Sequence, residues 1–188
     1  MVFSLISRIV NGVKEGVKAS LKGVEDVGGT IINVVKDIAA TTFEETGDLV
    51  SKGVGAAASV VKGSISGVSD VGASVVGSIR GIIKGTITGF MEAGGKQDQA
   101  VEGAVSQSIH SAKELGLNVG EVAVEAVRGS IQTITTLGGD TAGAAKTAVY
   151  AALKAAQNIG DETYKGVKES LKEGVEGAED VVRAFKED

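Results

Sequence analysis

The pattern of apolar and polar positions repeats along this chain. The segment that begins at Val17 (VKASLKGVEDVG) returns 44 residues later at Val61 (VKGSISGVSDVG), and a step of 22 residues defines eight units. Residues 1–16 form a partial unit before them, and residues 17–188 hold the eight units. All eight first residues are apolar: Val17, Ala39, Val61, Ile83, Val105, Val127, Val149 and Leu171.

The period of the repeat predicts α-helix. Eleven residues make three turns at about 3.67 residues per turn, close to the relaxed α-helical value of about 3.6, so one face stays in register over many repeats. Cations recur at the second position and acids at the tenth, both on the side opposite the apolar arc. We expect an all-α protein: a long amphipathic helix built on 11/22-residue repeats, straight or in a right-handed supercoil, or folded into a hairpin or an elongated bundle.

The apolar arc is the predicted interaction face. It is formed mainly by the first, fifth and eleventh positions of the units, which are apolar throughout. The face residues are Val17, Leu21, Val27, Val61, Ile65, Val71, Ile83, Ile87, Val105, Ile109, Leu115, Val127, Ile131, Leu137, Val149, Leu153 and Ile159.

Glycine occupies the twelfth position in six of the eight units. Small residues let helix backbones approach closely, so these residues are predicted to be close-packing glycines. They are Gly28, Gly72, Gly94, Gly116, Gly138 and Gly160. A further row at four-residue spacing indicates either hinges or close helix contacts: Gly77, Gly81, Gly85 and Gly89.

Hinges are expected where glycine pairs or a charged residue interrupt the pattern. We place them near residues 28–29, 94–99 and 138–139, the second because Asp98 stands at an apolar position after a glycine pair. The chain has 28 Gly and no Pro. Each glycine inside a helix costs about 1 kcal/mol relative to alanine, so an isolated helix of this composition is weak in water. The apolar face therefore needs a partner that covers it.

Residues that carry chemistry are scarce. The chain has no Cys and a single histidine, His110, so it has no thiolate zinc site and no two-histidine metal centre. The segment 89–97 lacks the spacing and the Ser/Thr of a phosphate-binding loop. A net charge of -5 argues against nucleic acid as a partner. We expect a protein that is not an enzyme, with no cofactor, no metal and no small-molecule substrate.

The chain also lacks the signals of a membrane-spanning or secreted protein. Its most apolar region, residues 53–91, carries four charged side chains, which a transmembrane segment would exclude. Residues 1–8 have no basic region followed by a long apolar core, so no secretion signal is expected. The expected location is intracellular, peripheral to a membrane or lipid surface.

Several segments resemble a known class of repeats. Lys14–Val17 and Lys172–Val175 resemble the KEGV core of synuclein repeats, and Val61–Ile65 and Val127–Ile131 are similar to the 11-residue repeats of synucleins and perilipins. The resemblance covers nearly the whole chain. It implies repeats that are disordered in solution and become long helices on membranes or lipid droplets. Late-embryogenesis-abundant proteins are more distantly similar and far more hydrophilic than this chain, whose mean hydropathy is +0.18.

Two functions remain open from the sequence. In the first, the apolar face docks into the headgroup boundary of a lipid surface. In the second, the same face is buried against other copies or against the chain's own folded-back arms, as a right-handed 11-residue-repeat coiled coil, a bundle or a filament with a structural role. The predicted partners are thus a lipid or membrane surface, other copies of the chain, or both.

Overall fold

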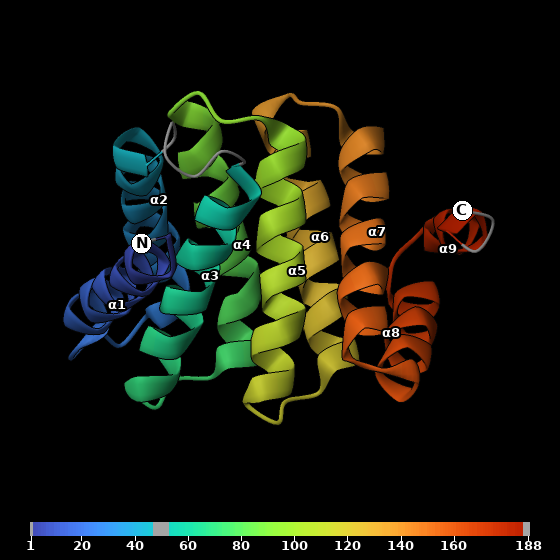
Figure 1. The fold of residues 1–188 in the computed structure, drawn as a ribbon, viewed down its shortest axis with the longest axis horizontal. Coiled ribbons are helices and arrows are strands. Elements are labelled where there is room, and N and C mark those ends of the chain that lie inside the picture. Colours follow the sequence, from blue (N-terminus) through green and yellow to red (C-terminus); the bar gives the residue numbers. More distant parts are fainter. Residues whose placement is uncertain (1, 47–52, 186–188) are drawn as a thin grey trace.

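The computed structural model describes residues 2–46 and 53–185, and within these ranges every regular element is an α-helix (Figure 1). The prediction of an all-α protein is confirmed. In chain order the helices are α1 (Val2–Leu21), α2 (Val27–Thr46), α3 (Gly53–Asp70), α4 (Val75–Glu92), α5 (Gln97–Glu114), α6 (Val119–Leu137), α7 (Thr141–Ile159), α8 (Asp161–Gly174) and α9 (Ala178–Phe185).

The helices form an elongated bundle of two layers. Helices two places apart in the chain pack side by side, so that α1, α3, α5 and α7 make one layer and α2, α4, α6 and α8 the other. Short turns join the consecutive helices from α3 to α7, which therefore run antiparallel, and neighbours within a layer run parallel. The bundle extends from α1 and α2 at one end to α8 and α9 at the other, with the two ends of the chain far apart (Figure 1).

One repeat unit corresponds to one helix and its turn. Helices α3 to α7 begin at residues 53, 75, 97, 119 and 141, which are 22 residues apart. At the turn after α5, Gly116 has φ +68° and the N–H of Leu117 donates to the carbonyl of Ala112 at 2.9 Å, the geometry of a Schellman cap. The side chain of Asn118 then accepts a hydrogen bond from the N–H of Glu121 and caps α6.

The twelfth-position glycines therefore end helices, which differs from the close-packing role predicted for them. A Cβ added at five of them would meet nothing within 4 Å, and all five have positive φ: Gly72, Gly94, Gly116, Gly138 and Gly160. Glycine is favoured there because backbone conformations with positive φ are costly for residues with a side chain. Gly28 instead lies in the first turn of α2. Of the predicted hinges, 94–99 and 138–139 fall at or beside turns, whereas 28–29 is helical and the chain turns at 22–26.

The close contacts between helices use other glycines. A Cβ at Gly85 of α4 would lie 2.7 Å from the carbonyl oxygen of Ile32 and 2.9 Å from Cβ of Val35, both on α2. A Cβ at Gly63 of α3 would lie 2.6 Å from Cβ of Val13 on α1. Of the two roles expected for the row at four-residue spacing, close contact is the one observed for Gly81, Gly85 and Gly89.

The core also contains hydroxyl groups. Those of Ser108, Ser130 and Thr133 donate to the carbonyl four residues earlier in the same helix, at 2.9, 2.8 and 2.6 Å. Ser64 Oγ and Thr86 Oγ1 are buried and have no hydrogen-bond partner in the described part of the chain. Such groups lose their hydration without compensation, so each reduces the stability of the bundle.

Candidate interaction surface at the first helix pair

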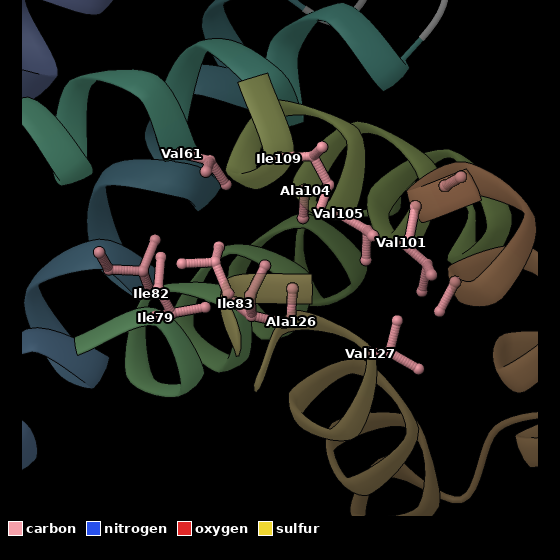
Figure 2. Close-up of a cluster of buried hydrophobic side chains, with 14 of the residues drawn as sticks. Val61, Ile79, Ile82, Ile83, Val101, Ala104, Val105, Ile109, Ala126 and Val127 are labelled. Atoms are coloured by element: carbon pink, nitrogen blue, oxygen red, sulfur yellow. The ribbon is translucent and has the colours of Figure 1, made fainter. Parts of the chain in front are cut away.

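The predicted interaction face lies mostly inside the bundle. Figure 2 shows part of it, with Val61, Ile83 and Ile109 pointing into a cluster shared by several helices. Eleven of the predicted residues are buried: Val17, Leu21, Val61, Ile65, Ile83, Ile87, Val105, Ile109, Val127, Val149 and Leu153. In this structure the chain covers its own apolar face with its own folded-back helices.

The other six predicted residues are less covered. Val27, Ile131 and Ile159 are half-buried and pack against the core. The remaining three are exposed and stand directly before turn glycines: Val71, Leu115 and Leu137. A helical wheel extrapolates one face through the whole repeat, and its prediction fails where the helix ends.

Helix α1 carries apolar side chains outside the core. Phe3 is 86% exposed, against 36–44% for Val71, Leu115 and Leu137, and Leu5, Ile6 and Ile9 are half-buried. The helix is also cationic, because three basic residues against one acid give it a net charge of +2: Arg8, Lys14 and Lys18 against Glu15. This helix thus combines exposed apolar surface with positive charge on a protein that is acidic overall.

A groove of about 550 Å³ lies between α1 and α2. Its apolar walls include Leu5, Ile9 and Val13 of α1 and Ile38 of α2, and Gly12 and Gly16 also line it. Charged residues stand around it: Arg8 on α1, and Asp37 and Glu45 on α2. The volume is within the range of about 300–1,000 Å³ for ligand sites, so the groove has room for apolar groups of a partner.

Ion pairs hold α1 to α3 on the side away from the groove. Lys14 Nζ lies 2.9 Å from Asp70 Oδ2, and Lys18 Nζ lies 3.5 Å from the same oxygen. The hydrogen bond from Lys14 lowers the pKa of Asp70 below its usual value, and its partner Asp70 raises the pKa of Lys14. Lys36 of α2 pairs in the same way with Glu92 of α4, at 3.2 Å. Helices α1 and α2 are therefore held by ion pairs to α3 and α4.

Other types of site find little support in the described residues. Their acidic side chains and His110 make no group of three that could hold a metal ion. His110 lies half-buried on α5. In residues 2–46 and 53–185, no helix combines the length and the apolarity that a membrane crossing requires.

The repeat pattern alone missed the groove. Residues 1–16 form only a partial unit, so the repeat assigns Leu5, Ile9 and Gly12 to no face. The four-residue spacing of Gly12 and Gly16, next to apolar residues at Leu5 and Ile9, was a signal that could have indicated a second face on this helix.

Comparison of the sequence with models of known protein families finds no match, and comparison with curated proteins finds no significant match.

Proposed function

We propose that this protein is a non-enzymatic binder of lipid or membrane surfaces, with α1 as the docking helix. The observation that carries the proposal is the exposed apolar surface of α1, centred on Phe3 and continued by Leu5, Ile6 and Ile9. A helix of this kind lies in the plane of a lipid surface with its apolar side chains below the headgroups.

The energetics favour weak and reversible binding. Burial of a phenylalanine side chain contributes about 1.5–3 kcal/mol, and the half-buried aliphatic residues of α1 add less because part of their surface is already covered. The chain carries a net charge of -5, so anionic lipid offers little general attraction. The surface that fits best is a neutral or zwitterionic one with exposed apolar gaps, such as a highly curved bilayer or an oil droplet.

The buried face reaches lipid only when helices separate. Most of the predicted interaction face faces the core, where it packs against small side chains and buried hydroxyls. The unpaired hydroxyls of Ser64 and Thr86 lower the cost of opening, because water or lipid headgroups can bind them once the helices part. We infer a sequence in which α1 docks first and the faces of further helices then exchange protein contacts for lipid.

Flotation with small zwitterionic vesicles and with a triglyceride emulsion tests the docking step. The Phe3→Ser variant is expected to lower the bound fraction several-fold. Leu137→Ser is the matched control, since it also removes an exposed apolar side chain but lies at the far end of α6. The proposal fails if the wild-type protein floats with neither surface, or if both variants lose binding equally.

A reversible cross-link tests the opening step separately. The chain has no cysteine, so Lys14→Cys with Asp70→Cys introduces a unique pair at neighbouring positions on α1 and α3. Joining the two thiols with a short reducible linker locks α1 to α3. If opening is required, lipid should change the amide hydrogen exchange of the locked protein less than that of the unlocked protein. Reduction of the linker should restore the full effect of lipid. Identical exchange in both states would contradict opening while leaving docking intact.

A further inference from the structure

The charged residues around the α1–α2 groove have no partner within the described chain. Arg8, Asp37 and Glu45 make no ion pair there, although Lys14, Lys18 and Lys36 on the same two helices do. The cation stands on α1 and the two acids on α2. The groove therefore presents an apolar centre with positive charge on one side and negative charge on the other.

The two helices also carry net charges of opposite sign. Helix α1 carries +2, whereas Asp37, Glu44 and Glu45 against Lys36 give α2 a net charge of -2. A two-fold axis through the groove would place α1 of one copy over α2 of the other, and the same pairing would occur a second time by symmetry. Such a surface is complementary to itself. An anionic lipid surface, by contrast, would face the acids of α2.

The groove is lined by two glycines on α1, and within this protein glycines on a helix face are covered by aliphatic side chains of a neighbouring helix. Within the chain, Gly63 and Gly67 of α3 are covered by Val13 and Val17 of α1, with added Cβ atoms falling 2.6 and 2.9 Å from the Cβ atoms of those valines. Gly12 of α1 lines the groove, and a Cβ added to it would meet nothing within 4 Å. Gly16 meets only Ile38 Cδ1, at 3.4 Å. The groove thus leaves room for aliphatic side chains from another helix.

We propose that the α1–α2 groove is the interface of a two-fold homodimer, in which a second copy places its own α1 and α2 across it. Apolar residues such as Ile9 and Ile38 pack at the centre, and Arg8 of each copy pairs with Asp37 or Glu45 of the other. The inference goes beyond lipid binding and does not rest on it, because the dimer would form in lipid-free solution.

Sedimentation equilibrium of the lipid-free protein over a wide concentration range is the first test. The mass is expected to rise from monomer to dimer. Gly12→Leu fills the groove and should weaken dimerisation by roughly tenfold or more. Gly166→Leu on α8 is the matched control, since a Cβ there also meets nothing within 4 Å but lies far from the groove. Circular dichroism is the check that each variant stays helical.

A charge exchange tests the geometry of the pairing. Arg8→Glu alone places acid against acid, and Asp37→Arg with Glu45→Arg places base against base, so each protein alone should be monomeric. Their mixture should recover a heterodimer, because both contacts across the two-fold axis are then complementary. Arg128→Glu on the exposed side of α6 is the control and should leave the mass of the dimer unchanged.

Three results would overturn the inference. The first is a wild-type protein that stays monomeric at every concentration. The second is a dimer whose affinity ignores Gly12→Leu and the charge changes. The third is a monomer whose vesicle flotation is lost on Gly12→Leu, which would assign the groove to lipid instead. Flotation lost on Phe3→Ser alone bears on the docking proposal and leaves the dimer untouched.

Discussion

The helix pairs α2–α4 and α5–α7 have the same arrangement but pack through different residues. Both pairs run parallel and lie two places apart in the chain. Between α2 and α4, glycines bring one backbone against the other, and added Cβ atoms at Gly81 and Gly85 would lie 2.7 Å from atoms of α2. In α7 the buried residues are mainly alanines, and its glycine, Gly143, meets the side chain of its own cap Asp140.

The polar contacts of the two pairs also differ, but here it is the α5–α7 contact that involves backbone. Lys36 and Glu92 form an ion pair between α2 and α4 at 3.2 Å. Between α5 and α7 the amide of Gln97 makes two hydrogen bonds to the backbone of Asp140, donating to its carbonyl at 2.8 Å and accepting from its N–H at 3.0 Å. Tolerance of added volume depends on the packing contacts, because two backbones in contact leave no room for adjustment, whereas contacts between methyl groups can adapt by small shifts. The N-terminal part of the bundle is thus the less tolerant of added volume.

The largest expected effect is the loss of the α2–α4 contact in Gly85→Ala. The new methyl would overlap the carbonyl of Ile32, which is backbone and cannot rotate away, so the helices must separate. We expect a loss of about 3 kcal/mol in the free energy of unfolding, measured by urea denaturation. Gly166→Ala is the control: its site is open, and it should gain about 1 kcal/mol from helix propensity. Equal effects of the two variants would contradict the backbone contact.

A smaller loss is expected from Ala148→Gly on α7. Ala148 is fully buried, so the variant loses about 1 kcal/mol in helix propensity and about as much again from the missing methyl group. The same denaturation experiment should give a loss of about 2 kcal/mol. An unchanged free energy of unfolding would mean that the alanine contacts of α7 contribute little to stability. The comparison of the two helix pairs would then depend on the α2–α4 contact alone.

The repeat explains how much of this architecture can be predicted. The 22-residue period predicts helix throughout, and it places the buried arc well, as Val61, Ile83 and Ile109 show. It does not say where the helix stops. A turn that preserves the 22-residue spacing leaves the apolar pattern on either side of it unchanged. The pattern therefore places Gly116 on a continuous helical face, although this glycine has positive φ and ends a helix.

The candidate surface was harder to predict, because it depends on which helices meet. Gly85 and Gly116 recur with different spacings, but spacing does not say which of them touches a neighbouring backbone and which ends a helix with φ +68°. The groove arises where α1 and α2 have no further pair packed on them among the described helices. A repeat shared by all units cannot distinguish the unit at the end of the row from those inside it.

A gain of stability is expected where a buried hydroxyl has no partner. Ser64→Ala on α3 and Thr86→Val on α4 remove groups that are buried without a hydrogen bond in the described residues. Each should raise the free energy of unfolding by about 1 kcal/mol. Ser108→Ala is the control, because its hydroxyl donates to the carbonyl of Ala104. If Ser108→Ala is as stabilising as Ser64→Ala, the absence of a partner is not the cause.

The smallest effect concerns the ion pair between Lys14 and Asp70, which supports the glycine contact of α1 with α3. The hydrogen bond from Lys14 lowers the pKa of Asp70 below the ordinary carboxyl value of about 3.8. The pair therefore stabilises the fold fully above that ordinary value. This contribution is lost as the pH falls through the lowered pKa of Asp70. The pKa of Lys14 is raised, so the contribution also disappears as the pH rises through a value above 10.5. Asp70→Asn should therefore lower Tm slightly at neutral pH and match the wild type in strong acid. A Tm difference for Asp70→Asn that persisted in strong acid would show that the side chain supports α1 by packing rather than by charge.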